Sequence, residues 1–228
     1  MRLKPLAWTA AVAITLGSTA AVANVVVVKS LGPSARAYPP GKTLPPAAKI
    51  TLQGGDVVTI LGPGTAQTFR GPGSFDTTQI GLDTAASQRG RFGALRTGHV
   101  EHSPSVWDID VTQSGKVCVA DAKKLQLWRP DSDADESIAI RSSDGTVEKL
   151  SWAKGKALAG WPAALAVKSG GKYEIASSER PDKSSLEVVT LSSVPSDNVA
   201  TAQELIRNGC ENQLDLLVAD SAKDRGTD

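Results

Sequence analysis

The chain has 228 residues with 25 basic and 24 acidic side chains, so its formal charge at pH 7 is +1. This balance gives no electrostatic basis for binding nucleic acid, which is typical of basic domains. The length suits one large domain or two small ones.

The first 23 residues have the three parts of a secretory signal peptide. Arg2 and Lys4 precede an apolar run from Leu6 to Leu16, and small residues lead to Ala23. The run is too short for a membrane-spanning helix, which needs about 20 apolar residues. We therefore expect cleavage after Ala23, no stable membrane anchor afterwards, and a periplasmic or secreted protein. Without Arg2 and Lys4, 23 basic side chains remain against 24 acidic ones, a formal charge of −1.

Residues 24–86 have the pattern of a small β domain. Strong strand formers bounded by glycine and proline are typical of β-hairpins. A Pro-rich segment at residues 37–48 lacks amide donors at four positions and is expected to be a loop. The strand candidates stand at residues 24–30, 48–52, 55–61 and 66–70.

The glycines between Ile60 and Phe75 resemble, at first sight, a phosphate-binding loop. Such a loop needs a lysine after its last glycine and a helix that begins there. No lysine follows, and Pro63 and Pro72 lie inside the two glycine pairs. The glycines are therefore interpreted as β-turn positions, and no cofactor is predicted.

Three turn motifs in this segment resemble the small periplasmic β domain of the ferric-citrate regulator (FecR) type. The motifs are Gly41 to Leu44, Gly55 to Val58 and Gly71 to Phe75. The resemblance implies a periplasmic β domain at residues 24–86. Two further segments, Trp107 to Val119 and Gly209 to Leu214, resemble uncharacterised exported proteins of Gram-negative bacteria that carry this domain. That second resemblance implies no biochemical activity.

Residues 87–104 are polar and rich in glycine, which is typical of an interdomain linker. Arg89, Arg91 and Arg96 stand in this segment and are possible contacts for an anionic envelope polymer. The alternative is a solvated connector. His99 and His102 also stand here, but a structural zinc site needs four ligands, so no metal is predicted.

Residues 105–195 are predicted to form an antiparallel β-sandwich. Many short strands separated by Ser-Gly, Pro-Asp, Asp-Gly and Gly-Gly turns are typical of that architecture. The seven strand candidates stand at residues 106–111, 116–120, 124–128, 137–141, 147–152, 172–176 and 185–191.

Four tryptophans of this region are candidates for ligand contact, at Trp107, Trp128, Trp152 and Trp161. Exposed rings would form a stacking platform for sugars. The alternative is that they are core or half-buried aromatics, which a small β core usually contains.

Asp131, Asp133 and Asp135 alternate as they do at the start of a calcium-binding loop. The sixth and twelfth positions should be Gly and Glu, but they are Glu136 and Ser142. A solvated turn is favoured over a calcium site.

Three fragments are similar to those of penicillin-binding enzymes, at residues 151–154, 168–170 and 196–198. In those enzymes the serine and lysine of the first fragment lie one helical turn apart. Here the fragment is predicted to be a strand, where positions three apart point to opposite faces. No catalytic residue is therefore predicted.

Residues 196–228 change to a helical pattern. Ser196 or Asp197 is expected to cap a helix, and Gly209 is expected to end it before a second helical stretch. An even cysteine count in an exported chain predicts a disulfide between Cys118 and Cys210. That bond would hold the helical segment against the sandwich, and two free buried thiols are the alternative.

The whole pattern predicts a mainly β protein that acts as a non-catalytic binding or scaffold module with a protein or envelope-polymer partner. The missing nucleophile and base pairs favour this over an enzyme, although paired carboxylates stay open as a third possibility. The second hypothesis is a protein that binds polysaccharide or cell-wall glycan through exposed tryptophans.

Overall fold

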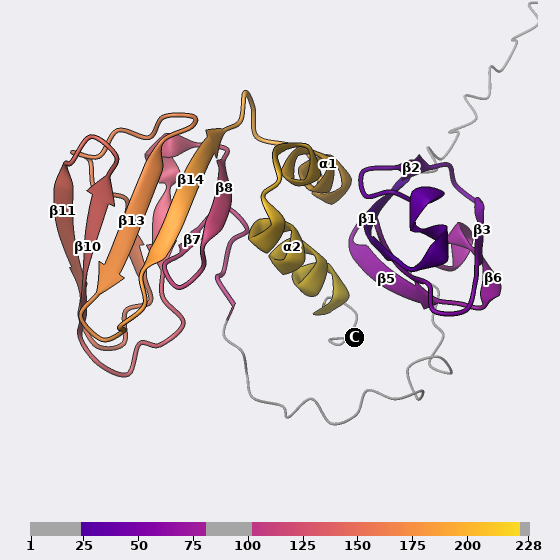
Figure 1. The fold of residues 1–228 in the computed structure, drawn as a ribbon, viewed down its shortest axis with the longest axis horizontal. Coiled ribbons are helices and arrows are strands. Elements are labelled where there is room, and N and C mark those ends of the chain that lie inside the picture. Colours follow the sequence, from indigo (N-terminus) through magenta and orange to yellow (C-terminus); the bar gives the residue numbers. More distant parts are fainter. Residues whose placement is uncertain (1–23, 81–101, 224–228) are drawn as a thin grey trace, which may run out of the picture.

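The computed structural model describes residues 24–80 and 102–223. The predicted signal peptide lies outside this range, as do Arg89, Arg91, Arg96 and His99. Within it the chain is mainly β with a pair of C-terminal helices, which confirms the predicted fold class. Two β units, residues 24–80 and the strands of residues 109–190, lie on opposite sides of the helical pair (Figure 1).

The first β unit contains six strands in two sheets. Four of them form a sheet in the order β2-β1-β4-β5, and β3 pairs with β6. The strands are β1 (Val25–Leu31), β2 (Thr43–Leu44), β3 (Lys49–Leu52), β4 (Val57–Gly62), β5 (Thr65–Arg70) and β6 (Gly73–Asp76). Two short 3-10 helices, η1 (Pro33–Arg36) and η2 (Thr77–Gln79), complete this unit.

The four consecutive valines of β1 are buried on both faces of the strand. Because side chains alternate along a strand, the run divides into two sets. Val25 and Val27 pack in the core of the first β unit with Ile60. Val26 and Val28 pack in a second cluster that includes the C-terminal helices.

The glycine-rich segment forms turns, as expected. β4 and β5 form a hairpin in which Gly62 is opposite Thr65, and Gly64 has a φ of 71°. A positive φ favours glycine because it has no Cβ. These glycines therefore shape the backbone of a hairpin.

Asp56 is a buried carboxylate that organises the start of β4. It is 1% exposed and accepts a hydrogen bond from the Ser34 amide at 2.9 Å. Burial alone raises the pKa of Asp56, but hydrogen bonds from Ser34 and Gln53 lower it below its ordinary value. Gly32, at a φ of 98°, lies against this carboxylate, and a Cβ there would be 2.5 Å from Oδ1. A larger residue at position 32 would therefore collide with the Asp56 carboxylate.

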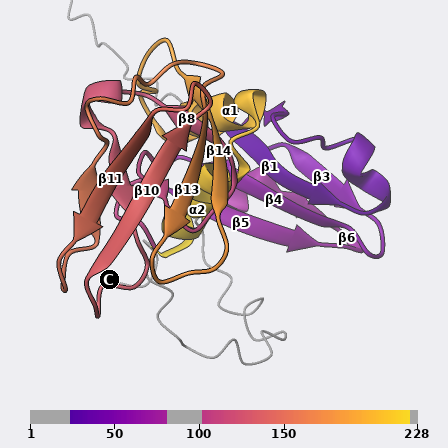
Figure 2. The ribbon, with the colours of Figure 1, turned by 60° about the vertical axis from the view of Figure 1, so that its left-hand side comes forward.

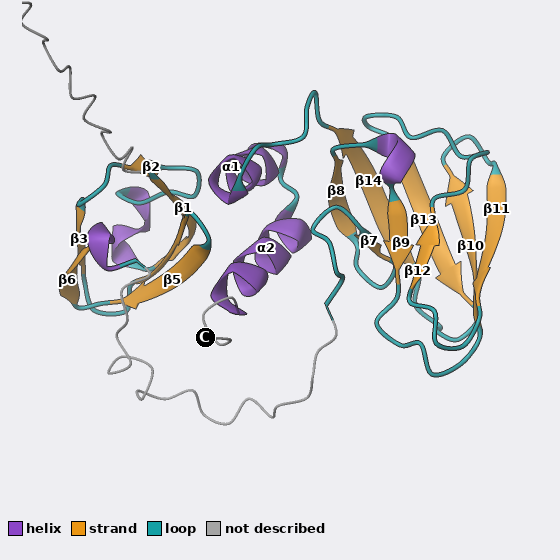
Figure 3. Ribbon diagram, turned by 180° about the vertical axis from the view of Figure 1, so that it is seen from behind, coloured by secondary structure: helices purple, strands orange, loops and turns teal. Residues whose placement is uncertain are grey.

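The second β unit has a five-stranded sheet in the order β11-β10-β13-β14-β8 and a three-stranded sheet in the order β12-β9-β7 (Figures 1 and 3). The bounds are β7 (Ile109–Asp110), β8 (Gly115–Val119), β9 (Gln126–Trp128), β10 (Glu136–Ser142), β11 (Val147–Trp152), β12 (Leu158–Gly160), β13 (Lys172–Ser177) and β14 (Ser184–Thr190). A 3-10 helix, η3 (Ala122–Lys124), precedes β9.

Most strand pairs in this unit are antiparallel, as predicted, but two are parallel. β8 pairs with β14, and β7 pairs with β9, in the parallel direction. β8 and β14 are far apart in the sequence, with β9 to β13 between them. Their pairing therefore depends on long-range packing and cannot be predicted from a local turn motif.

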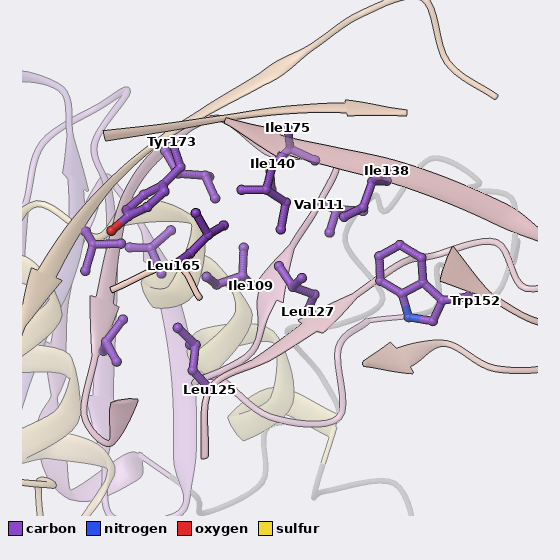
Figure 4. Packing of buried hydrophobic residues seen from close by; sticks show 14 residues of the cluster. Ile109, Val111, Leu125, Leu127, Ile138, Ile140, Trp152, Leu165, Tyr173 and Ile175 are labelled. Carbon is purple, nitrogen blue, oxygen red and sulfur yellow. The ribbon is translucent and has the colours of Figure 1, made fainter. Parts of the chain in front are cut away.

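The core of the second β unit lies between its two sheets. Figure 4 shows Ile140 and Ile175 of the larger sheet facing Leu127 and Ile109 of the smaller one. All four are at most 1% exposed. Trp152 closes one end of this core.

A buried ionic group lies beside Trp152. Arg129, 2% exposed, lies 3.5 Å from the Glu136 carboxylate, and Arg180 lies 3.5 Å from its other oxygen. Arg129 also donates to the carbonyls of Lys156 and Ala153 and lies over the Trp152 ring. Each buried charge thus has an opposite charge or an oriented carbonyl beside it, as burial requires.

The C-terminal helices are α1 (Asn198–Asn208) and α2 (Glu211–Lys223). Asp197 caps α1, since its side chain accepts a hydrogen bond from the Ala200 amide at 2.8 Å. Gly209 ends α1 with a φ of 73°. The cap and the break are where the sequence predicts them. The 60° view of Figure 2 also places the pair between the two β units.

Candidate functional site at the helical joint

Cys118 of β8 and Cys210, between α1 and α2, form a disulfide with a Cα–Cα distance of 5.9 Å. This confirms the predicted pairing. Both cysteines are fully buried. The bond fixes the joint of the two helices on the edge strand of the larger sheet.

Gln213 of α2 strengthens the same attachment. Its Oε1 accepts a hydrogen bond from the Cys118 amide at 2.6 Å, and its Nε2 donates to the Cys118 carbonyl at 2.9 Å. Nε2 also donates to the Val106 carbonyl at 2.8 Å. At Cys118, one side-chain amide thus makes the two backbone hydrogen bonds that a further strand beside β8 would make.

A single apolar cluster joins both β units to the helices. Val26 and Leu61 of the first β unit pack there with Leu205 of α1 and Leu217 of α2. Cys118 brings β8 of the second β unit into the same cluster. The helical pair therefore packs between the two β units through the apolar side chains of this cluster.

A cleft of about 450 Å³ lies between α2 and the second β unit. Its floor contains four buried apolar side chains, Ile109, Val117, Trp128 and Leu186. A concave site with an apolar floor and a few polar groups is typical of ligand-binding sites. The cleft is the candidate functional site.

Three carboxylates line this cleft, and they come from both of its walls. Asp108 and Asp110 stand at β7, and Asp215 stands on α2. Burial raises the pKa of Asp108 above its ordinary value, against the hydrogen bond that Ser103 donates at 2.9 Å. The Asp110 Oδ1 accepts two hydrogen bonds from Thr112.

The cations of the cleft are fewer. Lys116 lines it and is exposed, and His102 stands where the described chain resumes. Apart from the histidine, the described lining of the cleft contains three carboxylates and one ammonium group. The cleft therefore has an excess of negative charge when the carboxylates are ionised.

The four predicted tryptophans are packed against the protein itself. Trp128 and Trp152 are 4% and 2% exposed. Trp161 is half-buried, meets the Tyr173 ring edge-on and donates from Nε1 to the Leu165 carbonyl at 2.8 Å. Trp107 is half-buried against the helical cluster. Among the four, Trp128 lines the cleft.

The predicted acidic turn uses its carboxylates internally. Asp131 accepts a hydrogen bond from the Asp133 amide, and Asp135 accepts one from the Lys154 amide. Across residues 24–80 and 102–223, no group of three or more His, Cys, Asp or Glu is placed to hold a metal ion. Asp131, Asp133 and Asp135 are exposed, and the preference for a solvated turn over a calcium site stays a prediction.

Ser151, from the fragment similar to penicillin-binding enzymes, lies on β11, and its hydroxyl is 2.7 Å from the Ser137 hydroxyl across the strand pair. It is exposed at the surface. Its role in the described structure is a cross-strand hydrogen bond.

Sequence reasoning missed Gln213 and the cleft. Cys210 immediately precedes α2, and Gln213 lies three residues later in its first turn, so the two lie on the same side of that turn. That spacing was the available signal once a disulfide to Cys118 was expected. The carboxylates of the cleft had no such signal, because β7 and α2 are far apart in the chain.

No family model, curated protein or solved structure matches this chain. In the described residues, neither α1 nor α2 nor any shorter helix has the length and apolar character needed to span a bilayer.

Proposed function

We propose that this protein is a non-catalytic periplasmic binding or scaffold module that takes part in envelope signalling or maintenance through a protein or envelope-polymer partner. The signal-like first 23 residues and the FecR-type turns of residues 41–75 support the location. The disulfide supports it too, because such bonds persist in oxidising compartments.

The observation that carries the proposal is the packing of the helical pair between two β units. Val26 and Val28 reach it from one side, and Cys118 is bonded to it from the other. This arrangement fixes two β surfaces and one cleft relative to each other. A fixed arrangement of surfaces lowers the cost of ordering on binding, which suits a scaffold.

The glycan-binding alternative depends on exposed aromatic rings. Trp128 and Trp152 are buried, and Trp107 and Trp161 present only part of each ring. The packing of these rings favours the scaffold proposal over stacking on sugars. Fluorescence titration with cell-wall glycans separates the two, because saturable quenching by one polymer supports the alternative.

Photo-cross-linking in intact cells tests the proposal. A benzophenone amino acid replaces Gln113, exposed at the cleft, or Val147, 40% exposed on β11 at the far edge of the sheet. A lysine-reactive cross-linker covers the remaining surface. We expect a discrete adduct in the periplasmic fraction. A chain retained in the cytosol with both cysteines open to alkylation would contradict the location, and no adduct by either method would contradict the binding role.

A further inference from the structure

The cleft between α2 and the second β unit has the dimensions of a site for side chains. Its volume of about 450 Å³ lies inside the range of about 300 to 1,000 Å³ that is usual for ligand sites. The floor is apolar, with Ile109 and Leu186 on the sheets and Leu216 on α2 among the lining residues. An occupant therefore needs an aliphatic part that covers this floor.

The charge of the cleft defines the other part of the occupant. Asp110 stands on the β wall and Asp215 on the helical wall, with Asp108 on the β side as well. Carboxylates on two walls of one cleft both attract a cation that lies between them. Among the residues that the structure describes, Lys116 is the one lysine that lines the cleft, and the lining carboxylates outnumber it.

A lysine or arginine side chain combines both parts. Its methylene stem covers apolar surface while its charged head stays at the polar rim. The two walls are held by the Cys118–Cys210 disulfide and by Gln213, so the cleft exists before an occupant arrives. A preformed site avoids much of the ordering cost of binding.

We propose that this cleft binds a lysine or arginine side chain of an extended segment of a partner protein, with apolar residues beside it. This inference rests on the proposed function as a binding module, and it names the chemistry of the partner. The apolar neighbours cover the floor, and the cationic head lies between Asp110 and Asp215.

Calorimetric titration of the full mature chain with short peptides tests this site. The probe is the acetylated and amidated peptide Ala-Leu-Lys-Leu-Ala, and the matched peptide has norleucine in place of lysine. We expect saturable binding of the lysine peptide and binding at least tenfold weaker for the norleucine peptide. Raising the salt concentration should weaken the lysine peptide alone, because salt screens exposed charges.

Variants locate the binding on the protein. The double variant Asp110→Asn with Asp215→Asn should weaken the lysine peptide at least tenfold, and asparagine at 110 keeps the oxygen that accepts from Thr112. The control is Asp182→Asn, an exposed carboxylate outside the cleft. Circular dichroism and a count of free thiols show that each variant is folded and oxidised.

Four results would overturn the inference. The first is equal affinity for both peptides, and the second is unchanged affinity in the Asp110 and Asp215 variant. The third is displacement of the lysine peptide by putrescine at equal concentration. The fourth is tighter binding of the lysine peptide after Arg89, Arg91 and Arg96 are replaced by glutamine. The third would assign the cleft to a small amine, and the fourth would assign it to the chain's own segment. If cross-links in cells persist while the peptide does not bind, the module proposal stands and this inference alone is wrong.

Discussion

Gln213 bonds both backbone groups of Cys118, at 2.6 Å through its oxygen and at 2.9 Å through its nitrogen. Cys118 is bonded covalently to Cys210 at the helical joint, and its backbone groups are hydrogen-bonded by Gln213 of α2. Two independent attachments, one covalent and one polar, meet at the same point of β8.

Replacing Gln213 by leucine should destabilise the protein by about 2–4 kcal/mol, because it leaves buried backbone groups of Cys118 and Val106 without partners. Urea denaturation measures the free energy of unfolding. The control is Gln126→Leu at an exposed position of β9, which should change that free energy by about 0.5 kcal/mol or less. Equal effects of the two variants would argue against the edge role.

Removing the disulfide with Cys118→Ala and Cys210→Ala should cost about 4–5 kcal/mol, since the bond closes a loop of 92 residues. The expected shift is in the midpoint of guanidinium denaturation. As a check, adding a reductant should destabilise the wild-type protein and leave the double variant unchanged. A double variant as stable as the wild type would show that the helices are held without the bond.

Arg129→Met should destabilise the second β unit by about 3–5 kcal/mol, because it removes the buried one of the two cations beside Glu136 and leaves that carboxylate with the partly exposed Arg180 and the Ser177 hydroxyl. Lys183→Met provides the contrast. Its ion pair with Glu174 is solvent-exposed, so the expected cost is at most about 1 kcal/mol. Thermal unfolding by circular dichroism compares the two, and similar melting shifts would contradict the buried role of Arg129.

Asp197→Ala should cost about 1 kcal/mol at pH 7, because the side chain caps α1. The hydrogen bond from the Ala200 amide and that from Ser196 lower the pKa of Asp197 below 3.8. A lowered pKa in the folded state stabilises the protein above pH 3.8 and loses this effect as pH falls through the folded value. The difference between wild type and variant should therefore shrink below pH 3.8. A difference that stays constant down to pH 2 would contradict the capping role.

Most of the strands were predictable from the sequence because their local signals are strong, but β2, β6 and β12 are not among the predicted strands. The prediction of a loop over residues 37–48 is wrong at β2, because Thr43 and Leu44 lie between the two proline pairs and pair with β1. β1, β4 and β14 contain runs of β-branched residues, and glycine turns bound several of the others. The two ends of α1 were predictable from Asp197 and Gly209, because helix caps depend on residues within one turn of the helix end. These features need no knowledge of distant parts of the chain.

The arrangement of the elements was not predictable in the same way. The parallel pairing of β8 with β14 and the contact of α2 with the β7 side of the cleft join distant segments. The valine run at Val25–Val28 did hold a signal, because an uninterrupted apolar strand is buried on both faces. It did not say that α1 and α2 would cover the second face.

Differential scanning calorimetry of the oxidised chain from residue 24 onward tests the central claim that the helical pair joins both β units. The account predicts one transition whose calorimetric and van't Hoff enthalpies agree, because the cluster of Val26, Leu205 and Cys118 is shared by all three parts. Two separate transitions in the wild-type protein, each with its own enthalpy, would contradict it.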